Sequence, residues 1–172
     1  LIPAFAAHLT STTVGSTAGF TGLSVNTLYA FQVRTQDLSS LTYSAYTSVI
    51  STYTLANAPV SLATTSVTSG AVGLSWGDGG NPAGTLFTLE RSTNGVTFTA
   101  VVNQTGTTYS DPTVAAGTSY AYRVRARNGN NVWTAPSNVV LVTTIGVPIA
   151  PKRPSGLWAE RTDSGGGNFQ MV

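Results

Sequence analysis

Alternation with a period of two is the feature of this sequence that most restricts its fold. In residues 120–127, two Tyr, a Val and an Ala alternate with an Ala and three Arg, and residues 29–36 follow a similar pattern. Such segments are rich in Val, Thr, Tyr and Phe, and turn residues interrupt them about every 8 to 12 positions. Alternating residues point to opposite faces of a strand, and no helical period competes with this one. The pattern therefore predicts an all-β fold.

The chain also repeats itself at a spacing close to 90 residues. The matching segments are residues 29–35 with 120–126 at an offset of 91, residues 44–50 with 134–140 at an offset of 90, and residues 59–62 with 154–157 at an offset of 95. A repeat of this length is one β-domain and is too long for a solenoid unit. We therefore expect three copies of one module.

Strand-like segments follow one another through the middle copy. They are residues 59–62 (A), 72–76 (B), 87–92 (C), 96–102 (C′), 107–111 (E), 116–124 (F) and 137–142 (G). In this order, residues 58–144 resemble a fibronectin type III domain of the kind found in tandem in bacterial extracellular proteins. The resemblance implies an immunoglobulin-like β-sandwich with Trp76 in its core. It also implies a tyrosine corner, in which the Tyr120 hydroxyl bonds to the backbone upstream of strand F, with Tyr29 as its counterpart in the first copy.

The repeat predicts one complete sandwich between two partial ones. Residues 1–56 are expected to supply strands C′, E, F and G of a first domain, residues 57–145 a complete domain, and residues 146–172 a linker with strands A and B of a third. A partial sandwich leaves core residues and a sheet edge uncovered. Two explanations remain open: the chain is a window on a longer tandem array, or it is a fibre subunit whose end strands complete the next copy.

Composition excludes several classes of function. Only 8% of the residues are charged, the net charge is +2, and there is no Cys, while Thr and Ser number 28 and 18. This charge is too low for binding to nucleic acid, and no disulfide or thiolate site can form. The most apolar stretch, residues 139–151, is shorter than the roughly 20 residues of a membrane span. A surface rich in hydroxyl groups and poor in charge suits an extracellular protein.

The residues that carry acid–base or metal chemistry are few and scattered. The single histidine is His8, and the carboxylates are Asp37, Asp78, Glu90, Asp111, Glu160 and Asp163. No pairing or cluster among them indicates catalysis or a metal site, so we predict no enzymatic activity, no cofactor and no bound metal. Asp37 and Asp111 are expected to form turns, and residues 77–81 a flexible B–C loop. Glu90 is the expected partner of one of Arg123, Arg125 and Arg127.

The F–G loop, residues 128–133, is the best candidate for binding. Trp133 offers an exposed ring, and Asn130 and Asn131 offer amides that suit a glycan or a cell-surface protein. The alternative is that Trp133 packs against the sheet edge.

Three hypotheses for function follow. The first is a non-catalytic spacer or adhesion segment of a larger extracellular, surface-exposed repeat protein, whose partners are neighbouring repeats or other copies of itself. The second is a self-assembling fibre subunit. The third is an accessory region of a secreted polysaccharide-degrading enzyme. The fold alone does not separate them.

Overall fold

The computed structural model describes residues 10–148, and every regular element in that range is a β-strand. The strands are β1 (Leu28–Phe31), β2 (Ile50–Tyr53), β3 (Val60–Val67), β4 (Val72–Gly77), β5 (Leu86–Ser92), β6 (Thr99–Gln104), β7 (Thr108–Asp111), β8 (Ser119–Arg127) and β9 (Val140–Thr143).

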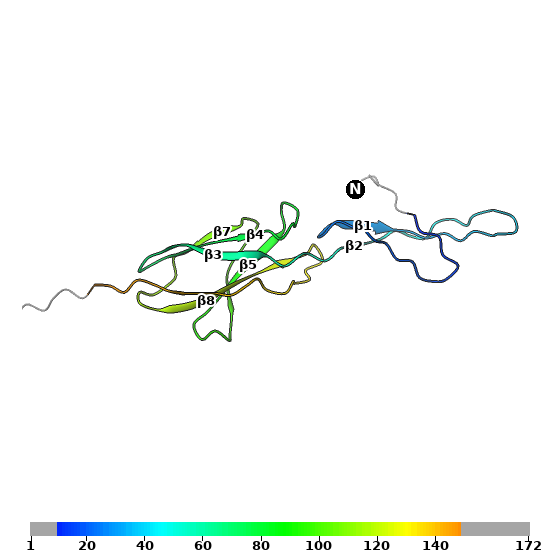
Figure 1. Cartoon of the computed structure of the whole chain (residues 1–172). Coiled ribbons are helices and arrows are strands. Elements are labelled where there is room, and N and C mark those ends of the chain that lie inside the picture. The colour runs from blue at the N-terminus through cyan, green and yellow to red at the C-terminus, as the bar shows by residue number, and fades with distance from the viewer. Residues whose placement is uncertain (1–9, 149–172) are drawn as a thin grey trace, which may run out of the picture.

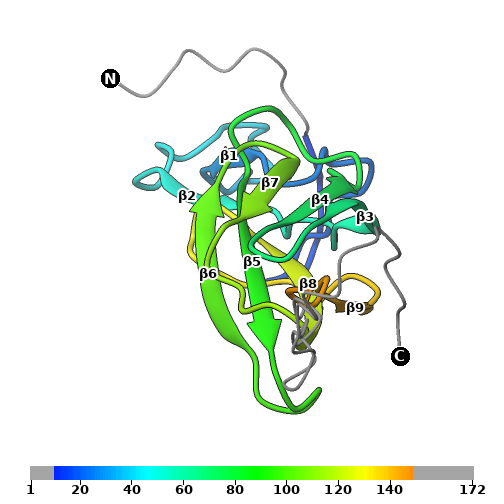
Figure 2. The same cartoon turned by 90° about the vertical axis from the view of Figure 1, so that its left-hand side faces the viewer.

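Strands β3 to β9 form a two-sheet sandwich (Figures 1 and 2). One sheet has the order β3-β4-β7 and the other the order β6-β5-β8-β9, and all neighbouring strands are antiparallel. The prediction of an all-β sandwich is thereby confirmed. All seven segments expected from A to G are present, in the predicted order along the chain.

Alternating side chains from both sheets fill the space between them. Tyr122, Val124 and Ala126 of β8 are 0% exposed, whereas the arginines between them are only half-buried. The opposite sheet contributes Leu74 and Trp76, and the Trp76 ring lies edge-on to Phe87 at 6.3 Å between centroids. The period of two seen in the sequence therefore separates core from surface as expected.

Strand β6 begins three residues later than the expected C′ segment. The Asn94 side chain accepts hydrogen bonds from the backbone N–H groups of Val96 and Thr97, both at 2.9 Å. These bonds keep the chain in a turn until Thr99, where pairing with β5 starts.

The strands β1 and β2 form a separate hairpin that repeats the β8–β9 pair. Tyr29 pairs with Thr52 in the hairpin, as Tyr120 pairs with Val142 in the sandwich. Ser24 N–H donates to the Tyr29 hydroxyl at 2.9 Å, and Ala115 N–H donates to the Tyr120 hydroxyl at the same distance. Both copies therefore have the tyrosine corner that the family resemblance implies.

The hairpin and the β8–β9 pair also agree outside their paired strands. Isolated bridges join Gln36 to Tyr43 and Arg127 to Trp133, at offsets of 91 and 90 residues. The hydroxyls of Thr54 and Thr144 accept from the N–H groups of Thr27 and Thr118 at 3.0 and 2.9 Å. The hairpin is thus the structural equivalent of strands F and G, with the same strand pairing and several of the same side-chain bonds.

The hairpin lacks the second half of a sandwich among the described residues. Val33 is 64% exposed, while its counterpart Val124 is fully buried. Residues 10–27 form no strand, although C′ and E were expected before β1. In the sandwich these strands pair with β5 and β4, and no equivalent of either is present in residues 10–27. Residues 1–9 and most of the predicted segment 146–172 lie outside the described range.

Candidate functional site

The F–G loop of the sandwich is built around a buried asparagine. Asn128 is 4% exposed, and its Oδ1 accepts from the N–H groups of Asn130 and Val132 at 3.1 and 2.8 Å. Asn131 has φ of +64°, in the left-handed region that Asn tolerates. The loop is therefore a defined turn.

This loop contacts the hairpin directly. Asn128 Nδ2 donates to the Thr54 carbonyl at 3.1 Å, and Asn130 Nδ2 donates to Thr52 Oγ1 at 2.6 Å. The backbone N–H of Gly129 donates to Asn26 Oδ1 at 3.1 Å. We call this contact the joint; it consists of Asn26, Thr52, Tyr53 and Thr54 on the hairpin, and Thr85, Asn128, Gly129 and Asn130 on the sandwich.

Residues 54–59 link the hairpin to the sandwich and are bound to the B–C loop. Asn57 N–H donates to Asn81 Oδ1 at 2.9 Å, and Asn81 Nδ2 donates back to the Asn57 carbonyl at 2.8 Å. Asn57 Nδ2 also donates to the Gly79 carbonyl at 2.9 Å. Asn81 is 5% exposed. The B–C loop was expected to be flexible, but this pairing of two amides holds it against the linker, a contact that its glycine content does not reveal.

The three residues predicted for ligand contact have different surroundings. Asn130 is bonded to the hairpin, and Asn131 is exposed beside it. Trp133 is 42% exposed, and the Arg127 guanidinium lies 5.1 Å from its ring centroid. Trp133 thus packs on an arginine of the sheet edge while a large part of the ring remains open to solvent.

The row of arginines on β8 pairs with β5, as predicted. Arg123 Nε lies 2.5 Å from Glu90 Oε2, and Arg125 Nε lies 3.9 Å from the same oxygen. The Arg123 guanidinium also covers the Phe98 ring at 4.1 Å. Glu90 therefore hydrogen-bonds to Arg123, and Arg127 stacks on Trp133. Arg125 Nε is buried and has no hydrogen-bond partner among the described residues.

Asp111 has a larger structural role than the turn expected of it. It does accept from Thr113 N–H at 2.9 Å, as in an Asx turn, but the side chain is 0% exposed. Its other partners are Arg91 Nη1 at 2.7 Å and the Tyr122 hydroxyl at 2.9 Å. Burial raises the pKa of Asp111, but hydrogen bonds from Thr113 and Tyr122 and the charge of Arg91 outweigh it, so that the pKa lies below 3.8.

Asp37 forms only a turn, at the position equivalent to Asn128. Its Oδ1 accepts from the N–H and hydroxyl of Ser39 at 2.8 and 2.7 Å, and its Oδ2 accepts from the Ser40 hydroxyl. These bonds lower the pKa of the exposed Asp37 carboxyl to about 2. The arrangement stabilises a loop.

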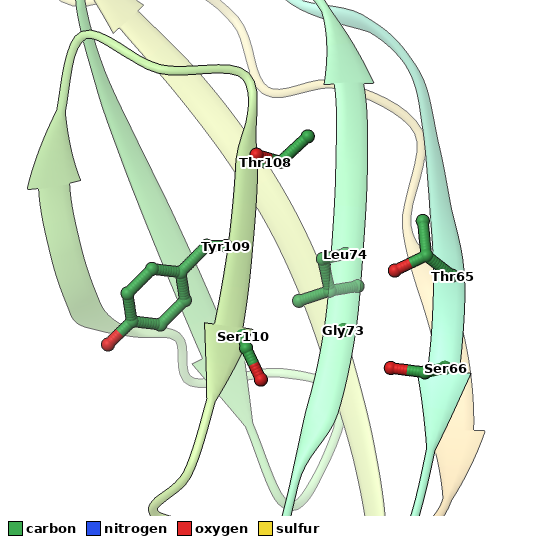
Figure 3. Close-up of a pocket in the computed structure, with 7 residues that line it drawn as sticks. All are labelled: Thr65, Ser66, Gly73, Leu74, Thr108, Tyr109 and Ser110. Atoms are coloured by element: carbon green, nitrogen blue, oxygen red, sulfur yellow. The ribbon is translucent and has the colours of Figure 1, made fainter.

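A shallow depression of about 400 Å³ lies on the outer face of the three-stranded sheet. Figure 3 shows the hydroxyl-bearing side chains that border it, with Gly73 between them: Thr65, Ser66, Thr108 and Ser110. None of the side chains in its lining is an acid, base or nucleophile activated by a neighbour.

Within residues 10–148, no group of three or more His, Cys, Asp or Glu side chains is arranged to hold a metal ion. The same residues include no helix long and apolar enough to cross a membrane. His8, Glu160 and Asp163 lie outside the described range.

Two curated bacterial proteins align with most of the chain. Chitinase A1 of Niallia circulans is 31% identical over 147 residues, which is 80% of this chain and 20% of the chitinase. Exoglucanase B of Cellulomonas fimi is 29% identical over 177 residues, which is 87% of this chain and 16% of the exoglucanase. The chain therefore spans a fifth or less of the length of these relatives. No protein-family model matches the sequence.

Solved structures align with about half of the chain. A domain of the human fibronectin type III domain containing protein 3 is 26% identical and covers 54% of this chain and 88% of its own, with a TM-score of 0.48. A Fn3-like protein from Clostridium thermocellum is 28% identical and covers 53% of this chain and 95% of its own, with a TM-score of 0.43.

The strand order identifies the fold of the sandwich. Strands β3, β4 and β7 are A, B and E, and they face β6, β5, β8 and β9, which are C′, C, F and G, with the tyrosine corner before F. The sandwich has the fibronectin type III fold. Its B–C and F–G loops, at the end where many sandwiches bind ligands, both contact the preceding segment of the same chain.

Proposed function

We propose that this chain is a non-catalytic spacer in a longer extracellular protein, and that this protein degrades a polysaccharide. The observation that carries the proposal is the extent of the similarity to the chitinase. An alignment of 147 residues is longer than the sandwich strands, which run from Val60 to Thr143, so it takes in residues beyond one fibronectin type III domain. The exoglucanase aligns over a similar length, which supports the same context.

The hairpin supports a tandem arrangement. Its bonds repeat those of strands F and G, and its residues Tyr29, Phe31 and Val33 match core residues of the complete domain. We propose that residues 1–56 belong to a second fibronectin type III domain whose A, B and C strands cover this face. The division at residues 57–145 and 146–172 remains a prediction, as do the adhesion and fibre hypotheses.

The coding region on both sides of this segment tests the enzyme context. We expect sequencing to reveal a glycoside hydrolase domain and further fibronectin type III repeats. A repeat array that ends in a surface anchor, without any hydrolase domain, would contradict the proposed context and favour the surface-protein hypothesis.

A deletion experiment tests the spacer role in the parent protein. Replacing residues 57–145 by a Gly/Ser linker of equal length removes the complete domain, keeps the connection and leaves the preceding module whole. We expect unchanged kcat/KM on soluble oligosaccharides and slower release of sugar from the insoluble polymer. An equal loss on both substrates would show that the segment contributes to the chemical step.

A further inference from the structure

The joint contains several hydrogen bonds in a small area, and every side chain that makes them is uncharged. Asn26 bonds to both loops of the sandwich: its Nδ2 donates to Thr85 Oγ1 at 2.8 Å, and its Oδ1 accepts from Gly129 N–H at 3.1 Å. Thr85 is 4% exposed and its hydroxyl donates onward to the Pro82 carbonyl, so the acceptor is held in place. Because the Asn26 side chain bonds to two fixed groups of the sandwich at once, the hairpin can change its orientation relative to the sandwich only slightly.

Packing at Gly129 adds a steric constraint. A Cβ atom placed on Gly129 would lie 2.4 Å from two ring atoms of Tyr53, so the ring rests directly on the glycine backbone. No side chain fits between these residues unless the ring moves. The close approach also explains why glycine occupies this loop position, where no left-handed backbone requires it.

The linker is too short and too well bonded to act as a free hinge. Only residues 54–59 separate β2 from β3, and Asn57 makes three hydrogen bonds with the B–C loop. A Cβ on Gly79 would lie 2.4 Å from the Ala58 carbonyl oxygen, and Pro59 is buried. The linker and both loops therefore constrain the hairpin from different sides.

We propose that the joint holds the preceding module and the fibronectin type III domain in one fixed orientation, so that the two move as a rigid body. This inference deepens the spacer function proposed above, on which it rests: it describes a stiff rod instead of domains on flexible tethers. The partner that the B–C and F–G loops fit is the end of the preceding module where strand F begins and strand G ends. Amides and hydroxyls hold this contact, so its geometry is insensitive to salt and to pH between about 5 and 9.

The joint is specific to this pair of modules. The position of Asn26 in the repeat is occupied by Gly117 in the sandwich, and that of Thr52 by Val142. The far end of the sandwich therefore lacks the amide that bridges both loops here. Asn26 and Gly117 share a left-handed φ, of +42° and +62°, so an Asn26→Gly variant removes the bridging amide and keeps a backbone that the repeat already uses.

Residual dipolar couplings of the 172-residue chain in solution test the proposal. We expect couplings from the β1–β2 hairpin and from the sandwich strands to fit a single alignment tensor, in low salt and in 0.5 M salt alike. In Asn26→Gly we expect two tensors, and exchange of the Gly129 amide hydrogen faster by roughly fivefold to tenfold, the value of one lost hydrogen bond. Asn131→Gly is the matched control, because Asn131 also has a left-handed φ and its side chain makes no hydrogen bond with the described residues.

A second pair of variants tests the packing independently. Gly129→Ala displaces the Tyr53 ring, whereas Gly70→Ala adds a methyl group with no atom within 4 Å. We expect two tensors for the first variant and one for the second. Separate tensors in the wild type, or loss of the cross-strand contact between Tyr29 and Thr52 there, would overturn the proposal, and so would a single tensor in both Asn26→Gly and Gly129→Ala. A mobile joint would leave the spacer function intact as a flexible one, so the two proposals fail separately.

Discussion

Replacing Asp111 by alanine removes the common acceptor of a buried hydrogen-bond cluster. The carboxylate is 0% exposed and receives Arg91 Nη1 at 2.7 Å, the Tyr122 hydroxyl at 2.9 Å, and the Thr113 hydroxyl and N–H at 2.7 and 2.9 Å. Three donor residues from β5, β8 and the turn after β7 thus meet on one side chain. We expect the Asp111→Ala variant to lose more stability than any exposed substitution in the chain.

The magnitude follows from what each donor keeps. Tyr122 is 0% exposed, so its hydroxyl loses its acceptor without access to water, at a cost of about 1–3 kcal/mol. Arg91 is 22% exposed and still donates to the carbonyl and hydroxyl of Thr113. The loss of its carboxylate partner should therefore cost about 1 kcal/mol, which is less than the cost of breaking a fully buried ion pair. The turn bonds of Thr113 add about 1 kcal/mol. The expected loss in the free energy of unfolding is about 4 kcal/mol.

Urea unfolding at pH 7, followed by tryptophan fluorescence, measures this loss, and Tyr122→Phe provides the thermodynamic cycle. Alone, Tyr122→Phe removes one of several donors and should cost about 1 kcal/mol. In the Asp111→Ala background it should cost close to nothing or stabilise, because the hydroxyl it removes no longer has an acceptor. Equal costs of Tyr122→Phe in both backgrounds would refute the argument that Asp111 is the partner of this hydroxyl.

The same cluster predicts the response to acid. The folded pKa of Asp111 is lowered below 3.8, so the unfolded chain takes up the proton at a higher pH than the folded chain. The stabilisation is therefore complete above about pH 5 and declines as the pH falls through the folded pKa. Asp111→Asn should have a shallower loss of stability below pH 4 than the wild type. Parallel curves for the two proteins would show that this carboxyl does not contribute to acid unfolding.

Variants at three further positions test other parts of the fold. Tyr120→Phe removes the hydroxyl of the tyrosine corner and should lower the free energy of unfolding by about 1 kcal/mol in urea, and no loss would argue against the corner bond. Ser137→Ala leaves the N–H of the buried Val124 without its acceptor and should lower the free energy of unfolding by about 2 kcal/mol. Ser137→Thr should lower it by less than about 0.5 kcal/mol, because Thr47 accepts the same bond at the equivalent position of the hairpin. Trp133→Ala should lower the free energy of unfolding by about 1 kcal/mol or less. Reduced retention of this variant on an insoluble polysaccharide would support the predicted ligand contact, whereas a large unfolding effect alone would assign the ring to packing.

Strand identity was predictable here because a single physical signal carries it. The alternation that includes Tyr122 and Val124 separates buried from solvated side chains, and it can be recognised without knowledge of the neighbouring strand. The repeat likewise predicted that residues near Tyr29 would pair as strands F and G do. The prediction of where β6 begins was less accurate, because hydrogen bonds to the Asn94 side chain hold the chain in a turn up to Thr99. Such bonds produce no periodic pattern in the sequence.

The joint and the buried cluster depend on contacts between distant residues. Asn26 and Gly129 are 103 positions apart, and neither residue differs in type from an ordinary turn former. Asp111 was correctly expected in a turn, but its burial depends on Arg91 reaching across from the other sheet. Local sequence shows which residues accept a turn, and only the packing of the two sheets shows which of these turns are buried.

The abundance of Thr and Ser has a structural cause beyond surface chemistry. On the return of each F–G hairpin, a residue pairs with strand F through its own N–H and its own hydroxyl: Ser137 N–H donates to the Val124 carbonyl, and Ser137 Oγ accepts from Val124 N–H. Thr47 does the same with Val33 in the first hairpin. A carbonyl of the returning strand would normally be this acceptor, so the hydroxyl lets the strand diverge while the inner amides of strand F stay satisfied. These hydroxyls therefore satisfy inner amides of strand F without adding charge to the chain.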